Sequence, residues 1–277
     1  MLRIAIFGDS HYRWGDLYRA SIIMKDKYGC SYGIHTGDLG FTASSFDRNM
    51  RFPFPIYAVD GNHEDHQLLS EIACQDPSLD PWSETGVAWM RRGSVMDIDG
   101  VRVGFIGGAL HAHARQVTIP EIPEDKPLPL DKKNISWAQY PLDDDVLSLI
   151  NNIQDRKLDL LVSHSCPSQA GIGMKSVGKW ELSTNYHIKR RGLSSGPSND
   201  LGEPSLTSLR NLLGCSLSPY FWVFGHWHRV IRHYDPFSRT EYLCVGTCDA
   251  SMKSTFIPHF YDVEQGNIVV GNPESLL

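Results

Sequence analysis

The sequence predicts an α/β protein that combines parallel strands, helices and antiparallel strand pairs. Three observations support this fold class. Short, continuous apolar runs recur along the chain, and strands that are buried on both faces require such runs. Apolar residues at helical spacing follow several of these runs. The dipeptide Asp99-Gly100 stands between two alternating segments, where it is typical of a two-residue hairpin turn.

The first third of the chain alternates predicted strands with predicted helices. Apolar runs place strands at residues 2–7, 32–36 and 55–59. Helical spacing places helices at residues 16–27, 43–50 and 66–73, each of which completes a strand–helix unit. A polar motif follows each strand, so we expect the reactive side chains at the carboxyl ends of the strands.

The remainder of the chain adds a hairpin, further buried strands and closing antiparallel pairs. The hairpin joins residues 87–97 to 101–107, and buried strands follow at 158–163 and 220–224. Helices are predicted at 143–156 and at about 205–213, and strand pairs at 230–234 with 242–246 and at 256–263 with 268–270. Prolines and charges make most of 114–142 an exposed excursion. No repeat or linker divides the chain, so we expect one domain over residues 1–277.

Composition and charge exclude several classes of protein. A length of 277 residues with 41% apolar and 21% charged residues suits one large soluble domain. The formal net charge of -6 argues against general electrostatic binding of extended nucleic acid. The six cysteines lack CxxC spacing, which predicts reduced thiols. Without a signal-peptide pattern or an apolar run of ~20 residues, we expect a cytoplasmic protein with no membrane partner, whose oligomeric state stays open.

Five predicted strand ends carry the same kinds of side chain. They are Asp9 and His11 in GDSH, Asp38 in TGD, Asn62 and His63 in GNHE, His164 in VSHS, and His226 and His228 in GHWH. Taken singly, a histidine is more often packed in a core or exposed than bound to metal. Together these side chains offer carboxylate, imidazole and amide ligands without thiolate, a set that suits Mn, Fe, Ni or Zn. Side chains at the carboxyl ends of neighbouring strands converge in one crevice.

The number of candidate ligands predicts two metal ions. All of these residues except His63 are candidates, which is too many for one tetrahedral ion. Two ions that share a bridging carboxylate fit better, and such ions lie ~3.5–4 Å apart with an acidified water between them. The glycines before Asp9, Asp38, Asn62 and His226 are expected to permit the tight turns that aim each ligand inward.

In their order, the motifs DxH, GD, GNHE, a lone His and GHxH resemble those of the calcineurin-like metallophosphoesterase family. The resemblance spans residues 8–228. It implies a four-layer αββα sandwich of two mixed β-sheets flanked by helices, the metallo-dependent phosphatase-like fold. It also implies two divalent ions, with Mn or Fe preferred, and an enzyme that hydrolyses phosphate esters.

The resemblance further implies a role for each site residue. Asp9, His11 and His228 would hold one ion, Asn62, His164 and His226 would hold the other, and Asp38 would bridge them at the catalytic centre. His63 is similar to the family's histidine that contacts the phosphate and assists the leaving oxygen. The implied mechanism is in-line attack on phosphorus by a metal-bridging hydroxide, without a phosphoenzyme.

Two features depart from the family's usual pattern. Tyr12 follows His11 where the family often has glycine, which makes this edge of the site bulkier. The sequence GDLGF stands where the protein phosphatase branch has GDxxDRG, so protein phosphatase activity is not expected. The residues after His228 are predicted to form closing strands, without the accessory domain of the family's nucleases.

Three further residues are candidates for contact with the substrate. Arg13 could clamp a phosphate as a bidentate donor, with an ordinary surface position as the alternative. His111 and His113 follow a predicted strand and alternate as ligands do, and they could touch the substrate at the rim of the site.

The leading hypothesis is a two-metal hydrolase that acts on a small-molecule or nucleotide phosphate ester, as a phosphatase or a phosphodiesterase. One alternative is a nuclease that acts on nucleic-acid ends. The other is a non-catalytic metal-binding scaffold of the same fold, which should have lost ligands that are all present here. The sequence leaves open the substrate and the choice between monoester and diester.

Overall fold

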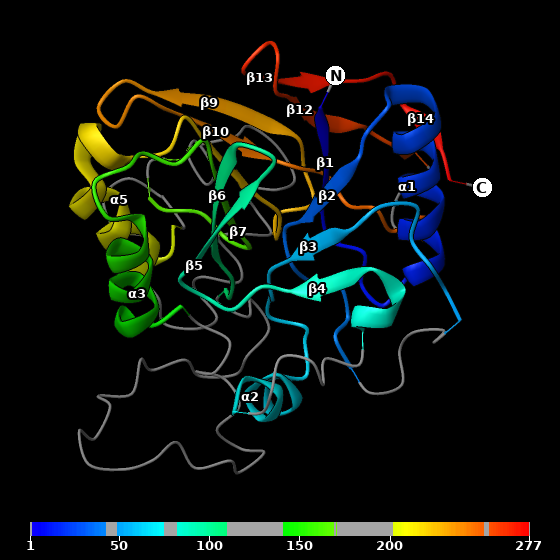
Figure 1. Cartoon of the computed structure of the whole chain (residues 1–277), viewed down its shortest axis with the longest axis horizontal. Coiled ribbons are helices and arrows are strands. Elements are labelled where there is room, and N and C mark those ends of the chain that lie inside the picture. Colours follow the sequence, from blue (N-terminus) through cyan, green and yellow to red (C-terminus); the bar gives the residue numbers. More distant parts are fainter. Residues whose placement is uncertain are drawn as a thin grey trace, which may run out of the picture.

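The structure, a computed structural model, describes residues 2–42, 49–74, 82–109, 141–168, 170, 202–251 and 255–276. Its strands form two six-stranded sheets and one short pair (Figure 1). The first sheet has the order β13 (Asn267–Val270), β12 (His259–Asp262), β1 (Arg3–Phe7), β2 (Tyr32–His35), β3 (Ile56–Ala58) and β4 (Val87–Trp89). Its strands β1 to β4 are parallel, and β12 and β13 add antiparallel pairs.

The second sheet repeats this mixture of directions. Its order is β5 (Ser94–Ile98), β6 (Val101–Ile106), β7 (Leu160–Ser163), β8 (Phe221–Phe224), β10 (Thr240–Cys244) and β9 (Ile231–Asp235). The four central strands are parallel, and an antiparallel strand closes each edge. Strands β11 (Thr255–Phe256) and β14 (Glu274–Ser275) form the short pair.

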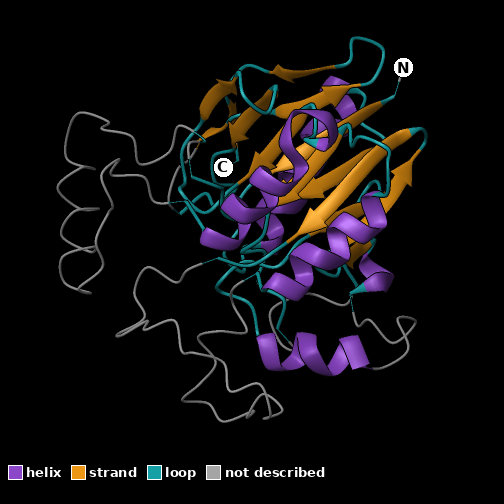
Figure 2. Ribbon diagram, turned by 90° about the vertical axis from the view of Figure 1, so that its left-hand side faces the viewer, coloured by secondary structure: helices purple, strands orange, loops and turns teal. Residues whose placement is uncertain are grey.

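Helices cover the outer face of each sheet. They are α1 (Trp14–Tyr28) on the first sheet, and α3 (Asp143–Ile153) and α5 (Pro204–Leu217) on the second. The helix α2 (His66–Cys74) lies below the strands in Figure 1, and a short 3-10 helix spans Ser83–Thr85. Figure 1 shows α1 on one side of the strands and α3 and α5 on the other, and Figure 2 looks onto one outer face, where helices lie in front of the strands. None of the helices in the described ranges is long and apolar enough to cross a membrane.

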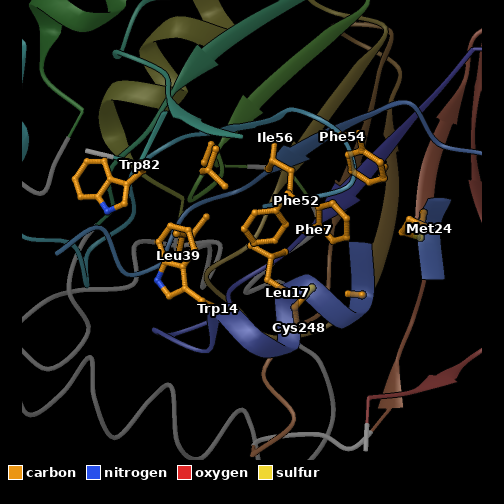
Figure 3. Packing of buried hydrophobic residues seen from close by; sticks show 14 of the residues in the cluster. Phe7, Trp14, Leu17, Met24, Leu39, Phe52, Phe54, Ile56, Trp82 and Cys248 are labelled. Carbon is orange, nitrogen blue, oxygen red and sulfur yellow. The ribbon is translucent and has the colours of Figure 1, made fainter. Parts of the chain in front are cut away.

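The alternation of buried side chains along the strands explains the four layers. In β1, Ala5 and Phe7 join the cluster that contains residues of α1, whereas Ile4 and Ile6 join the cluster between the sheets. Figure 3 shows the first of these clusters, where Phe7 and Phe54 stack with ring centroids 6.5 Å apart. Because Ile4 to Phe7 are buried on whichever face they lie, this part of β1 is apolar throughout. The predicted four-layer αββα sandwich of two mixed sheets is therefore confirmed.

One predicted strand is wrong in an informative way. Residues 87–97 were expected to form one arm of a hairpin, but they form β4 in the first sheet and β5 in the second. The chain crosses between the sheets at Arg92 and Gly93, where Arg92 bonds to buried Asp60 and Gly93 takes a φ of +81°. The hairpin itself is confirmed for β5 and β6, because Ile98 pairs with Val101 across Asp99-Gly100.

Candidate metal centre

The candidate site lies where the carboxyl ends of strands from both sheets meet. Strands β1, β2 and β3 of the first sheet lead into its first three motifs, and β7 and β8 of the second sheet lead into the last two. A parallel bridge between Gly8 and Thr247 joins the end of β1 to the segment after β10. The two sheets therefore deliver residues from opposite ends of the chain to one place, as the carboxyl ends of parallel strands do.

The first group of ligands comprises Asp9, His11 and His228. Their ligand atoms lie within 4.8 Å of one another. His228 Nε2 is 3.8 Å from Asp9 Oδ1, and the rings of His11 and His228 meet edge to face with centroids 4.7 Å apart. Both oxygens of Asp9 accept from the backbone N–H of His226 at 3.0 Å, which fixes this buried carboxylate.

The second group comprises Asp38, His164 and His226, with Asn62 beside them. His164 Nε2 is 3.3 Å from Asp38 Oδ1 and 3.2 Å from Asn62 Oδ1. It is also 3.2 Å from His226 Nδ1. Four atoms that can each offer a lone pair therefore lie close together. Such a set of donor atoms can bind a metal cation.

Asp38 faces both groups. Its Oδ1 lies toward His164 of the second group, and its Oδ2 is 3.6 Å from His11 Nε2 of the first. All seven residues that the sequence nominated as ligands therefore lie together. Asp9, His11 and His228 lie on one side of Asp38, and Asn62, His164 and His226 lie on the other, so the donors of the site fit the binding of metal cations.

The buried carboxylates Asp9 and Asp38 attract positive charge to the centre of the site. Burial alone would raise the pKa of Asp38, but His164, His11 and His63 hold that pKa well below its usual range. Burial alone would lower the pKa of His164, whereas Asp38 and Asp9 raise it to about 10. The carboxylates therefore keep a proton on His164 when no metal competes for the ring. Metal binding at neutral pH would release that proton.

His164 is oriented by a bond from its far nitrogen. Its Nδ1 lies 2.8 Å from the carbonyl oxygen of Thr36, and its ring is fully buried. When Nδ1 carries the hydrogen and donates it to this oxygen, Nε2 keeps its lone pair and faces the second group. Bonds of this kind fix the tautomer of histidines that bind metals.

The ligands themselves adopt the strained backbone of the site. His11, Asp38, His226 and His228 have φ values of 45°, 52°, 65° and 51°, in the left-handed region that residues with a Cβ rarely adopt. Such conformations persist where the surroundings enforce them, and they gather at functional sites. Four of the predicted ligands therefore share a strained backbone conformation.

The glycines before the ligands serve a different purpose from the one predicted. They were expected to permit tight turns, but of the four only Gly37 has a positive φ, at +97°. The absence of a side chain at the others leaves space for neighbouring atoms. A Cβ on Gly61 would lie 2.2 Å from Asp38 Oδ1, and one on Gly225 would lie 2.5 Å from Asp9 Oδ2. The motifs need glycine there because neighbouring ligands occupy the space.

We expect Gly61→Ala to disrupt the site, because its methyl group would also lie 2.7 Å from His164 Nε2. The added atom must displace Asp38 or His164, so metal binding should be lost and the free energy of unfolding should fall by about 1–3 kcal/mol. Titration with Mn²⁺ and thermal unfolding measure the two effects. The control is Gly15→Ala in α1, whose Cβ would meet only Arg19 at 3.9 Å. Normal metal binding by Gly61→Ala would contradict this account.

His63 and Tyr12 form the exposed side of the site. The side chain of His63 is 38% exposed, and its Nε2 is 3.9 Å from Asp38 Oδ2. The Tyr12 hydroxyl donates a hydrogen bond to the backbone carbonyl of His63, and its ring lies against Gly40. The residue that departs from the family's glycine therefore supports the histidine that faces solvent.

The three candidates for substrate contact have different outcomes. Arg13 is half-exposed near the first group, but its Nε bonds to Asp16 Oδ2 at 3.1 Å, so one edge of its guanidinium already has a partner. His111 and His113 lie outside the described residues. The predicted helix at 43–50 and most of the excursion at 114–142 also lie largely outside them.

Two buried residues outside the predicted ligand set also shape the site. Glu64 accepts from the backbone N–H groups of Gly61 at 2.7 Å and Leu39 at 2.8 Å, which ties the GNHE loop to the GD loop. His35 bonds through Nε2 to Ser10 Oγ at 3.0 Å and accepts from the Gly37 N–H at 3.2 Å, which joins the first two motifs from beneath. Burial lowers the pKa of His35 to about 3, so its ring is neutral. The one sequence feature that could have pointed to His35 is its position three residues before Asp38.

Comparison with protein families gives one match over most of the chain. The model of the calcineurin-like phosphoesterase family matches residues 2–230. The chain is also 25% identical over 214 residues to the lariat debranching enzyme of Schizosaccharomyces pombe. That alignment covers 77% of this chain and 42% of the relative, so the chain spans less than half of the relative's length.

Comparison with solved structures supports the fold. The protein TT1561 of Thermus thermophilus superposes with a TM-score of 0.50 at 10% identity, over 98% of each chain. The phosphopantetheinyl hydrolase of Mycobacterium tuberculosis has the same TM-score of 0.50 at 13% identity, over 91% of this chain and 92% of that one. At these identities the likeness concerns the fold alone.

Proposed function

Because this chain belongs to the calcineurin-like phosphoesterase family, we propose that it is a two-metal hydrolase of small-molecule or nucleotide phosphate esters. The observation that carries the proposal is the position of Asp38 between two ligand groups. A scaffold without activity has no need for two ligand groups that share a carboxylate. The oxygen and nitrogen donors suit Mn, Fe, Ni or Zn, and manganese or iron is the proposed choice among these ions.

In the proposed arrangement each side chain has one task. Asp9, His11 and His228 would hold one ion, Asn62, His164 and His226 would hold the other, and Asp38 would contribute to both sites. When bound, the ions would supply positive charge to the phosphoryl oxygens and acidify a water molecule. The water would attack phosphorus in line with the leaving oxygen. The backbone amide of His226 keeps Asp9 in place, and the carbonyl of Thr36 keeps His164 in place.

His63 is the proposed proton donor to the leaving oxygen. It is the most exposed histidine among those whose side chains approach Asp9 or Asp38, so a substrate can reach it. Burial of part of its ring lowers its pKa, so the neutral ring predominates at neutral pH while the protonated ring is a stronger acid. The backbone N–H of His63 donates to Asp38 Oδ1 at 2.9 Å, and the Tyr12 hydroxyl donates to the backbone carbonyl of His63. The backbone of His63 is therefore fixed on both sides.

The test is a phosphate-release screen with the metal-loaded protein. We expect hydrolysis of para-nitrophenyl phosphate or of its bis ester in the presence of Mn²⁺, and turnover of at least one nucleotide or sugar phosphate. The relative rates on the monoester and the bis ester would separate a phosphatase from a phosphodiesterase. Absence of hydrolysis after loading with Mn²⁺, Fe²⁺, Ni²⁺ or Zn²⁺ would favour the scaffold and contradict the proposal.

A nucleic-acid phosphodiester is the second candidate substrate. It is favoured by the similarity to a lariat debranching enzyme, and opposed by the net charge of -6. Labelled linear RNA, linear DNA and branched RNA, incubated with the Mn²⁺-loaded protein, would separate the alternatives. Release of nucleotides from linear ends supports an end-directed nuclease, cleavage at the branch alone supports debranching, and intact nucleic acids support a small substrate.

Asn62→Ala is expected to weaken one ion selectively. Asn62 Oδ1 lies 3.2 Å from His164 Nε2 in the second group and bears no carboxylate, so its loss removes one neutral ligand. We expect the affinity of the second group for Mn²⁺ to fall by at least about 10–100-fold, the loss that changes in the outer shell of a metal site cause. Isothermal titration resolves the two sites. Asn152→Ala, whose amide bonds to the Gly93 carbonyl on another face, is the control. Equal weakening of both sites would contradict the assignment of Asn62.

A further inference from the structure

We propose that Asp249 is a positioning residue for the metal centre: it orients His11 so that Nε2 faces the ions. The inference rests on the proposed function, because it takes His11 as a metal ligand. Asp249 follows β10, lies beyond residues 2–230 that the family model matches, and belongs to none of the five motifs. Its carboxylate is nevertheless buried beside the first ligand group, with 4% of the residue exposed.

The two nitrogens of His11 face two different carboxylates. Nε2 is 3.6 Å from Asp38 Oδ2, toward the centre of the site. Nδ1 is buried, has no hydrogen-bond partner among the residues that the structure describes, and lies 3.7 Å from Asp249 Oδ2. A neutral imidazole carries one N–H, so a hydrogen on Nδ1 that points to Asp249 leaves the Nε2 lone pair for a metal. A carboxylate behind a ligating histidine fixes both its tautomer and its ring orientation.

The carboxylate of Asp249 is held with one oxygen directed at His11. Its Oδ1 accepts from the Ser251 backbone N–H at 2.8 Å and from Ser251 Oγ at 2.5 Å. Its backbone N–H donates to Thr247 Oγ1 at 2.9 Å. Because these bonds engage Oδ1 and the main chain, Oδ2 is the oxygen that faces the ring.

The segment that carries Asp249 is fastened to the first motif. Thr247 Oγ1 and the Cys248 N–H both donate to the carbonyl oxygen of Asp9, at 2.5 and 3.0 Å. The Ala250 N–H donates to Asp16 Oδ2 at 3.0 Å. His11 and Asp249 are therefore attached to the same strand end, and their separation is set by the frame that also positions Asp9.

A purely structural role for Asp249 makes a different prediction from a positioning role. If Asp249 only stabilised its turn, an asparagine would serve nearly as well, because its amide oxygen can accept both bonds from Ser251. A positioning carboxylate cannot be replaced in this way, because the negative charge and the acceptor opposite Nδ1 of His11 are what the ring requires. Asp249→Asn therefore separates the two roles, and Asp249→Ala removes both.

The experiment measures metal affinity and the tautomer of His11 together. We expect the unfolding temperature of Asp249→Asn to lie within a few degrees of that of the wild type. The variant should nevertheless bind one of the two Mn²⁺ ions about 10–100-fold more weakly. With Zn²⁺ bound, ¹⁵N NMR of the histidine rings should place the hydrogen of His11 on Nδ1 in the wild type and show a shifted tautomer signal in the variant. Ser251→Ala, which keeps the carboxylate, should change the affinity much less.

The outcomes separate this inference from the proposed function. A wild type that binds two ions, with Asp249→Asn equal to it in affinity and His11 tautomer, overturns the positioning role and leaves the two-metal proposal intact. A wild type that binds no ions overturns both. If Asp249→Ala fails to fold, the asparagine variant still decides, because it retains the bonds to Ser251.

Discussion

Asp38→Asn is expected to lower kcat/KM by at least about 1,000-fold, which corresponds to about 4 kcal/mol of transition-state stabilisation. Asp38 is the one described side chain whose two oxygens face the two ligand groups, with Oδ1 3.3 Å from His164 and Oδ2 3.6 Å from His11. An asparagine keeps the acceptor for the His63 N–H but loses the charge and one oxygen donor. Hydrolysis of the bis ester with Mn²⁺ measures the loss.

The matched control for this variant is Asp65→Asn. Asp65 lies three residues beyond Asn62, and its Oδ1 accepts from the Leu68 N–H at 3.1 Å at the start of α2, a bond that asparagine can also make. It should keep nearly all activity. Because Asp38 is buried among histidines, the stability of Asp38→Asn must be measured as well. A folded Asp38→Asn protein with more than about a tenth of wild-type activity would show that no bridging carboxylate is needed.

His63→Ala is expected to retain both metal ions and to lose about 10²–10⁴-fold in kcat, the usual contribution of a general acid. The ring of His63 lies on the open side of the site, and its Nε2 is 3.9 Å from Asp38 Oδ2. His63 also belongs to a group with His11 and Asp38 whose atoms lie close enough to hold an ion. Metal analysis of the variant therefore decides between a proton donor and a ligand.

The leaving group provides a second test of His63. A proton donor matters most for poor leaving groups, such as an alkyl alcohol, and least for para-nitrophenol. The rate lost in His63→Ala should therefore be larger for an alkyl phosphate than for the nitrophenyl ester. His233→Ala, a change to a partly buried histidine of edge strand β9, serves as the control. Equal losses for both substrates, or loss of an ion, would assign His63 a different role.

Much of the fold could be predicted because each strand carries its own signal. Strand β1 is buried on both faces from Ile4 to Phe7, so these residues are all apolar, and the hairpin between β5 and β6 has Asp99-Gly100 at its turn. The break between β4 and β5 could not be predicted. It depends on the bond between Arg92 and Asp60, residues from distant segments, and local alternation cannot show that two adjacent strands enter different sheets.

The ligand residues could be nominated because they all follow buried strands. The same rule applies to Asp249, which follows β10, but its single carboxylate belongs to no motif and its role depends on contact with His11. The purpose of Gly61 was also beyond sequence reasoning, because the atom that would clash with its Cβ belongs to Asp38. Sequence patterns thus locate side chains that point into the site, whereas packing between motifs emerges only in three dimensions.

The most direct test of the two-metal site is anomalous X-ray diffraction from crystals loaded with Mn²⁺. The account predicts two peaks per chain about 3.5–4 Å apart. One should contact Asp9, His11 and His228, the other Asn62, His164 and His226, and Asp38 should contact both. A single peak, or two peaks that Asp38 does not join, would contradict it.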